Sequence, residues 1–155
     1  MRMRLLALTT DSNLLARLHA QCFAQAWSAE SFSVLLAEAA TFAIFCGDGF
    51  ILVRVVEGEA ELLSLGVTPA ARRRGIGAAL LEEALRQAAS RGAAAMFLEV
   101  AATNSPAIAL YKRYGFAQIG RRKGYYALAG APPEDALVLK VQIPPAPVGN
   151  TVQLG

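Results

Sequence analysis

Apolar positions recur at helical spacing near the start of the chain. Between residues 12 and 24, leucines lie on one face of a potential helix, behind a polar run, Thr10-Asp11-Ser12, that can cap it. A second short helix is expected over 29–39, with Ser28 as its cap. Residues 3–8 ahead of them have the pattern of a short strand. The chain therefore begins with a strand and two helices.

Three extended runs follow. The β-rich runs 41–46 and 50–56 flank Gly47-Asp48-Gly49, which predicts a hairpin. Glu57-Gly58 predicts another turn into a third strand over about 59–67. Because strands joined by short turns pair antiparallel, these three are expected to lie side by side.

A longer helical pattern comes next, over about 70–90, and the helix-stop pair Arg91-Gly92 ends it. The nearly continuous apolar run at 94–100 then predicts a buried strand, parallel to the strand before the helix. A helix is expected over about 105–114, followed by strands at about 116–122 and 136–142.

This order predicts one α/β (α+β) domain over residues 1–143. We expect a mixed central sheet of about seven strands with helices on both faces. Residues 144–155 begin with Pro-Pro-Ala-Pro and are expected to form a disordered tail.

Composition narrows the class of protein. Hydrophobic residues make up 55% of the chain, but no apolar run approaches the roughly 18 residues of a membrane span. The first apolar run is too short for a secretory signal, so we expect a cytoplasmic protein without a membrane partner. The net charge of +3 suits a polyanionic small ligand and does not demand nucleic acid.

The sequence offers no credible metal site. Cys22 and Cys46 lie in apolar surroundings and are expected to be free, buried thiols. His19, the single histidine, is expected to have a packing or surface role.

The run from Leu65 to Leu80 carries the clearest chemistry. Three arginines, Arg72–Arg74, lie where a strand leads into the expected helix, although a helix N-terminus disfavours cations by about 0.3–1 kcal/mol each. An anion docked among them would explain the arrangement, and Gly75 and Gly77 would let it approach backbone N–H groups. The stretch predicts a phosphate site that is neither a P-loop nor Gly-x-Gly-x-x-Gly.

Two motifs indicate a family. Arg-x-x-Gly-x-Gly at 72–77 resembles the acetyl-CoA pyrophosphate signature of the GNAT N-acetyltransferases. Asn-x-x-Ala-x-x-Leu-Tyr-x-x-x-Gly-Phe at 104–116 is similar to the second hallmark of that family. The resemblance implies the GNAT acyl-CoA N-acyltransferase fold, with two splayed parallel strands, and acetyl-CoA as cosubstrate without a metal.

More narrowly, the chain resembles the RimI-type ribosomal-protein-alanine N-acetyltransferases. The matches include Trp27-Ser28, Leu98-Glu99-Val100 and Arg121-Arg122-Lys123-Gly124-Tyr125-Tyr126. Two positions depart from the family pattern: Ala26, where Pro is frequent, and Ala101, where Arg is usual. This resemblance implies an acceptor that is a protein N-terminus, the alanine of a small-subunit ribosomal protein.

The resemblance also implies a coenzyme site. The end of the third strand would pair with the pantetheine arm, and a Val67 N–H aimed at the acetyl oxygen would act as the oxyanion donor. Gly66 also suits a bulge that opens the cleft, although a structural glycine is the alternative. The expected coenzyme contacts are Leu65, Gly66, Val67, Arg72, Arg73, Arg74, Gly75, Ile76, Gly77, Asn104 and Tyr111. For Asn104, a helix cap is the competing role.

Glu99 is the expected general base. A carboxylate between Leu98 and Val100 in a buried strand is costly unless it is paired or functional. A structural salt bridge is the alternative to catalysis. Tyr111 on the following helix would protonate the coenzyme thiolate, as the family counterpart is thought to do.

Five further residues are candidates for the acceptor groove, where a cationic N-terminus would favour carboxylates and aromatic walls. They are Trp27, Glu61, Tyr125, Tyr126 and Glu134, and each has a structural alternative. Because no cysteine lies near the motifs in the sequence, direct attack by the amine is expected rather than an acyl-enzyme.

Three other functions remain open from the sequence. One is the acetylation of a small-molecule amine, and another is acyl-CoA binding without catalysis. A nucleic-acid binder using Arg72–Arg74 and 121–123 is less consistent, because these basic residues form two short clusters rather than a stripe.

Overall fold

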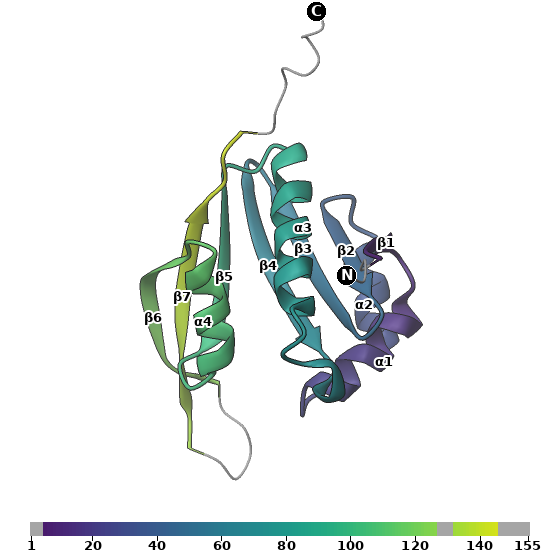
Figure 1. Cartoon of the computed structure of the whole chain (residues 1–155), viewed down its shortest axis with the longest axis horizontal. Coiled ribbons are helices and arrows are strands. Elements are labelled where there is room, and N and C mark those ends of the chain that lie inside the picture. The colour runs from purple at the N-terminus through teal and green to yellow at the C-terminus, as the bar shows by residue number, and fades with distance from the viewer. Residues whose placement is uncertain (1–4, 127–131, 146–155) are drawn as a thin grey trace, which may run out of the picture.

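A computed structural model describes residues 5–126 and 132–145. One seven-stranded sheet, with strand order β1-β2-β3-β4-β5-β7-β6, runs through it (Figure 1). The strands are β1 (Ala7–Thr9), β2 (Thr41–Cys46), β3 (Gly49–Val56), β4 (Glu59–Val67), β5 (Ala95–Ala101), β6 (Ala117–Tyr126) and β7 (Glu134–Gln142). The α-helices are α1 (Ser12–Cys22), α2 (Ala29–Leu36), α3 (Ile76–Ser90) and α4 (Ser105–Arg113), and a 3-10 turn spans Pro69–Ala71.

The mixed sheet and its helices agree with the expected fold class. β4 and β5 are parallel, whereas every other neighbouring pair of strands is antiparallel. The expected caps are present, because Asp11 accepts a hydrogen bond from Leu14 N and Ser28 accepts one from Ser31 N. The tail prediction for 144–155 lies outside the described residues, apart from 144 and 145.

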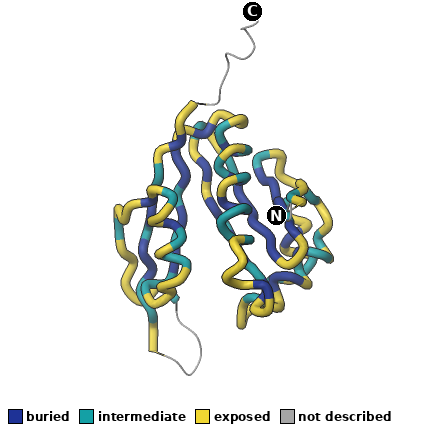
Figure 2. The backbone as a smooth tube through the Cα atoms, in the orientation of Figure 1, coloured by how far each residue is buried: buried dark blue, intermediate teal, exposed yellow. Residues whose placement is uncertain are grey.

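Helices cover both faces of the sheet and create two apolar clusters. On one face, α1 and α2 pack over β2 and β3 around Leu15, Phe32 and Phe50. On the other face, α3 and α4 pack around Leu80, Met96 and Tyr111. Figure 2 shows buried backbone concentrated in the central strands, whereas β6 is exposed along most of its length.

β4 and β5 part soon after they pair. Their ladder has three registered pairs, Glu59 with Ala95, Ala60 with Met96 and Glu61 with Phe97. Beyond these pairs the strands diverge, with α3 on one arm and α4 on the other (Figure 1). The two splayed parallel strands expected from the family resemblance are therefore present.

Several element boundaries differ from the sequence-based prediction. The helix expected over 70–90 begins at Ile76, because Arg73 and Gly75 have positive φ angles of 67° and 77° that an α-helix cannot contain. β1 covers 7–9, so residues 5 and 6 of the predicted strand over 3–8 are outside it while 3 and 4 lie outside the described residues, and α2 ends at 36 rather than 39. β6 and β7 both extend to the hairpin between them and are longer than predicted.

The bulge expected at Gly66 lies elsewhere. Leu52 pairs with Ser64 and Val53 pairs with Leu62, so Leu63 is the extra residue in β4. Gly66 keeps regular pairing with Phe50. A Cβ at Gly66 would lie 3.0 Å from both Cys22 Sγ and Phe50 Cε1, so the close approach of these side chains favours glycine there.

Candidate functional site

The turn ahead of α3 has the backbone of an anion site. Arg73 and Gly75 are left-handed, and Gly75 caps α3 without a side-chain hydrogen bond to the first N–H groups of the helix, which leaves those groups suited to an anion. Gly77 lies on the first turn of α3, where an added Cβ would be 3.5 Å from Leu110 Cδ2 of α4. The turn, α3 and α4 thus border the same opening.

Arg72 has a contact that the sequence did not indicate. Its Nε donates a hydrogen bond of 2.9 Å to the carbonyl oxygen of Val67, the last residue of β4. The side chain therefore ties the turn to the strand end. This contact uses only Nε, so the expected coenzyme contact of Arg72 stays a prediction for its remaining guanidinium N–H groups, and all three arginines are exposed on the same turn.

A cysteine lies closer to the motifs than expected. Cys22, at the end of α1, packs against Gly66 and interacts with Arg72. Burial raises the pKa of the Cys22 thiol, and the charge and hydrogen bond of Arg72 only partly oppose this shift. The thiol is therefore held in its protonated, weakly nucleophilic form, so its proximity does not make it an acyl carrier. Cys46 is buried, and both cysteines are free.

Glu99 lies on the face of the sheet opposite α3 and α4. Leu98 and Val100, its neighbours on β5, point into the cluster under those helices, so strand alternation directs Glu99 the other way. There it forms an ion pair with Arg122, with 2.6 Å between Oε2 and Nε. The salt bridge considered from the sequence is therefore present.

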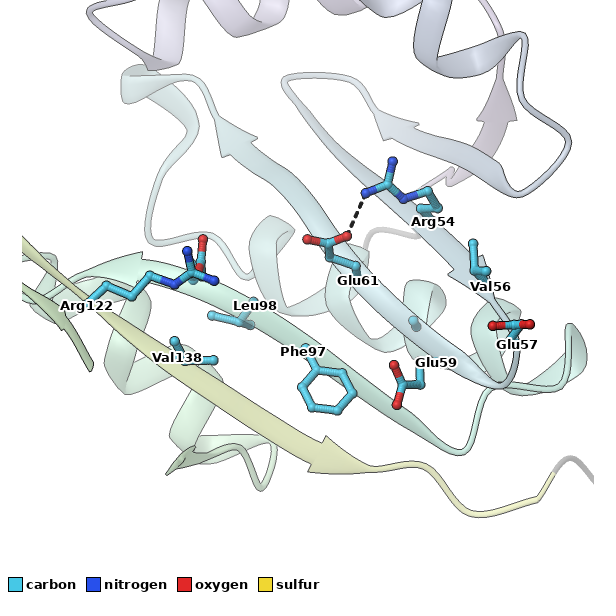
Figure 3. Close-up of a pocket in the computed structure, with 11 residues that line it drawn as sticks. Arg54, Val56, Glu57, Glu59, Glu61, Phe97, Leu98, Arg122 and Val138 are labelled. Carbon is cyan, nitrogen blue, oxygen red and sulfur yellow. Dashed lines mark hydrogen bonds and ion pairs between the residues drawn. The ribbon is translucent and has the colours of Figure 1, made fainter. Parts of the chain in front are cut away.

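Glu99 and Arg122 help to line an open cavity of about 530 Å³. Glu61 lines its β4 side and makes a 2.8 Å ion pair with Arg54 of β3. In Figure 3 the Arg122 side chain extends from β6 toward β4. The Glu61 side chain extends from β4, and a dashed line joins its carboxylate to Arg54. Two acidic candidates from the sequence, Glu61 and Glu99, are therefore brought to one pocket.

Tyr111 lies on the other side of the sheet from Glu99. It is buried in the cluster under α3 and α4, where its ring makes an edge contact with Phe116 at 5.6 Å between centroids. Burial raises the pKa of Tyr111 well above its ordinary value, with a smaller contribution from Tyr126. Its hydroxyl is therefore protonated at neutral pH.

The β6–β7 hairpin carries three of the acceptor candidates. The rings of Tyr125 and Tyr126 make an edge contact, and Tyr126 pairs with Glu134 across the hairpin. Burial raises the pKa of Tyr126, and the charge of Glu99 adds to the shift. Thr103, in the loop after β5, donates a hydrogen bond to Glu134. The hairpin therefore borders the carboxyl end of β5.

Trp27 is not brought to this pocket. It stacks on His19 with ring centroids 4.8 Å apart, and it lines a separate hollow on α2 with Glu30, Ser31, Val34 and Leu35. His19 is buried, and its Nδ1 accepts a hydrogen bond from Trp27 N, which agrees with a packing role. Trp27 thus belongs to the α1–α2 packing in this structure.

Asn104 is the N-cap of α4. Its Oδ1 accepts a hydrogen bond of 3.3 Å from Ala107 N. The competing role suggested by the sequence, that of a helix cap, is therefore present. The cap places the start of α4 directly after β5, at the edge of the opening.

Arg122 is the residue that sequence reasoning missed. It was grouped with Arg121 as part of a basic cluster, although adjacent residues on a strand face opposite sides of a sheet. Arg121 pairs with Asp135 at 2.6 Å, whereas Arg122 pairs with Glu99. Strand alternation through 121–122 was the signal that could have separated them.

The site combines a left-handed turn ahead of α3, a buried phenol, and an acidic pocket that reaches the parting of β4 and β5 at Glu61 and Glu99. Such an arrangement can hold a phosphate-bearing donor on the side of α3 and a cationic acceptor on the opposite side. In the described part of the chain, no group of three or more His, Cys, Asp or Glu residues is placed to hold a metal ion. Nor does any helix in those ranges have the length and apolarity to cross a membrane.

Comparison with known proteins identifies the family. Residues 13–116 match the model of the Acetyltransferase (GNAT) family. The [ribosomal protein bS18]-alanine N-acetyltransferase of Escherichia coli (strain K12) is 39% identical over 94 residues, which cover 61% of this chain and 63% of the relative. The aligned region thus spans less than two thirds of that relative.

Other matches extend over more of the chain. The N-alpha-acetyltransferase RimI of Mycobacterium tuberculosis is 36% identical over 132 residues, covering 78% of this chain and 82% of the relative. The crystal structure of the ribosomal-protein-S18-alanine N-acetyltransferase from Escherichia coli superposes with a TM-score of 0.81, at 30% identity, over 97% of this chain and 99% of that one. The chain therefore belongs to the GNAT acetyltransferase family.

Proposed function

We propose that this protein is an acetyl-CoA-dependent N-acetyltransferase that modifies a protein N-terminal α-amine, the alanine of a small-subunit ribosomal protein. The observation that carries the proposal is an acidic pocket that reaches the parting of β4 and β5 at Glu61 and Glu99, on the face of the sheet opposite α3 and the turn ahead of it. The names of the relatives from Escherichia coli and Mycobacterium tuberculosis support the acceptor class. Such an acceptor makes the cytoplasm the expected compartment.

The coenzyme would enter on the side of α3 and α4. The N–H groups at the start of α3 would hold its pyrophosphate, assisted by charge-assisted contacts from Arg72 and Arg74. The pantetheine arm would add along the free side of β4 at Leu65–Val67, where β5 no longer pairs. Asn104 and Tyr111 would border the arm from α4.

The chemistry would be a direct transfer. Glu99 accepts a proton from the acceptor ammonium, and the neutral amine attacks the thioester carbonyl carbon. The Val67 N–H stabilises the oxyanion, and the C–S bond breaks as the intermediate collapses. Tyr111 donates its proton to the departing thiolate, a role that requires the protonated phenol that burial maintains. The nitrogen is cationic after the attack and loses its second proton to the Tyr111 phenolate, while Glu99 returns the first proton to solvent, so that the products are the amide, the CoA thiol and one proton.

The acceptor would approach from the face that carries Glu99. Glu61, on the opposite wall of the pocket, supplies a second carboxylate near the incoming cation. Tyr125, Tyr126 and Glu134 on the β6–β7 hairpin would contact the first residues of the peptide. Trp27 would act indirectly, through the packing of α1 and α2.

The test is a transfer assay with acetyl-CoA and peptides that begin with Ala, Ser, Met or Gly, beside polyamines, read by mass. We expect acetylation of the α-amine of the Ala peptide. Turnover confined to polyamines would favour a small-molecule acetyltransferase. Coenzyme binding without turnover on any amine would contradict both enzyme functions and leave a non-catalytic acyl-CoA-binding module.

The catalytic roles are tested by substitution. Glu99→Gln and Tyr111→Phe should each lower kcat by about 10²-fold or more, because a positioned acid or base typically contributes that much. Coenzyme binding, measured by calorimetry, should persist in Glu99→Gln. Wild-type rates in both variants would overturn the role assignments without affecting the rest of the proposal.

A further inference from the structure

The ion pair between Arg122 and Glu99 joins two strands that are not neighbours. β7 lies between β5 and β6, and Glu99 is in register with Val138 while Arg122 is in register with Ala136. Residues two apart on β7 share a face, so the Arg122 side chain crosses this strand over small side chains. The sheet register therefore determines that this guanidinium reaches this carboxylate.

The pair occupies the position that the proposed reaction needs. If Glu99 takes the proton from the acceptor, the acceptor nitrogen must come within hydrogen-bond reach of its carboxylate. That carboxylate already holds a cation, with 2.6 Å between Arg122 Nε and Glu99 Oε2. The Arg122 side chain is 58% exposed and the guanidinium also lies 5.1 Å from the centroid of the Tyr125 ring. The guanidinium thus has a second favourable contact beside the carboxylate.

We propose that Arg122 is a positioning residue that holds Glu99 ready and competes with the acceptor ammonium for it. When the acceptor binds, the Glu99 carboxylate is shared between the Arg122 guanidinium and the incoming ammonium. The guanidinium keeps its contact with Tyr125. The proposal rests on the proposed function, because it takes Glu99 as the base. Arg122 touches neither acetyl-CoA nor the acceptor in this scheme and acts through Glu99.

Other charged and titratable groups surround the pair. They come from β3, β4, β6 and β7, and comprise Arg54, Glu59, Glu61, Tyr126 and Lys140. Arg54 is engaged by Glu61, and Lys140 lies over the Phe97 ring. Arg122 is therefore the cation that pairs directly with Glu99 among the described residues.

The proposal predicts opposite effects on binding and turnover. Removing the competing cation should strengthen acceptor binding, and removing the group that orients Glu99 should slow proton transfer. For Arg122→Ala we expect the acceptor KM to fall about threefold to tenfold and kcat to fall about tenfold or more. Arg122→Lys retains the charge and should restore both values toward those of the wild type.

Arg121→Ala provides a matched control. Arg121 is the adjacent residue on β6, makes an ion pair of the same length with Asp135, and faces away from Glu99. If Arg122 merely holds the hairpin together, both alanine variants should lose thermal stability and raise the acceptor KM in parallel. That result would overturn the proposal.

Peptide binding measured by calorimetry on the enzyme–CoA complex separates this inference from the proposed function. A peptide with a free N-terminal Ala should bind Arg122→Ala more tightly than wild type, whereas the same peptide with an acetylated N-terminus should bind both equally. Equal or weaker binding of the free amine would contradict the competition. A wild type that binds in this way but transfers no acetyl group would contradict only the proposed reaction.

Discussion

His19 illustrates how a single side chain fixes a local arrangement. Its ring stacks between Phe23 and Trp27, and its Nδ1 accepts the Trp27 N–H. The first helix and the segment that leads to α2 are thereby joined through one imidazole. Because the Nδ1 atom accepts, the ring proton of the neutral form lies on Nε2.

This environment predicts a pH dependence of stability. Burial lowers the pKa of His19 below its ordinary value, so the unfolded chain binds the proton first as pH falls. The free energy of unfolding should therefore decrease as pH drops from about 6.5 toward the folded pKa. In His19→Asn the pH-dependent part of the free energy of unfolding that comes from His19 should vanish. The lost ring contacts should also lower the free energy of unfolding by about 1–3 kcal/mol at any pH.

Urea unfolding at pH 5.5 and pH 7.5 measures the effect. The chain has one histidine, so no other imidazole contributes. A His19→Asn variant whose stability changes with pH as steeply as that of the wild type would contradict the assignment.

At the scale of elements, the bounds of a strand or helix could be predicted where a clear local sequence pattern marks its ends. β2 and β4 have their predicted bounds because apolar runs and glycine turns delimit them. The start of α3 was placed too early because the arginine run was counted into the helix, whereas Arg73 and Gly75 are left-handed and the apolar stripe begins only at Ile76. β6 was shortened because an exposed edge strand lacks strong alternation.

The candidate site shows the same limit. The glycine turn and the motif residues could be identified from local spacing, whereas the partner of Glu99 could not. Arg122 reaches Glu99 through the register of two strand pairs, β5 with β7 and β7 with β6, which no local pattern encodes. The contacts of Arg72 and Cys22 depend likewise on how α1 meets the end of β4.

The cap of α4 permits a test of Asn104. Serine caps helices about as well as asparagine, so Asn104→Ser should leave the free energy of unfolding within about 0.5 kcal/mol, whereas Asn104→Ala should cost about 1 kcal/mol. If the side chain also contacts pantetheine, both variants should raise the KM for acetyl-CoA. An unchanged KM in the serine variant would confine Asn104 to the cap.

At the scale of the whole molecule, the two arms of the sheet are joined by the apolar cluster under α3 and α4 and by a few polar contacts. Three ladder pairs join β4 to β5, and farther along Tyr114 donates a hydrogen bond of 2.5 Å to Glu82, which links the end of α4 to α3. This bond raises the pKa of Tyr114, so the phenol remains the donor. The two arms of the sheet are thus connected at the closed end and diverge toward the site.

A ligand that contacts both arms should stabilise the folded protein. Coenzyme A at 100 times its dissociation constant should add about 2.7 kcal/mol, because the unfolded chain lacks the site. At the same concentration, pantetheine should raise the melting temperature far less, since it lacks the pyrophosphate for the turn before α3. Equal shifts for the two compounds, measured by calorimetry, would contradict the placement of the anion.

The early end of the β4–β5 ladder has a consequence for amide exchange. Beyond Glu61, the N–H groups of β4 that point toward β5 have no partner in that strand and are left to water. Their deuterium uptake should be rapid in the free protein and slow when an extended ligand lies along the strand. Deuterium uptake at residues 62–67 therefore reports whether the donor is bound along β4. The antiparallel β5–β7 ladder supplies a protected internal reference.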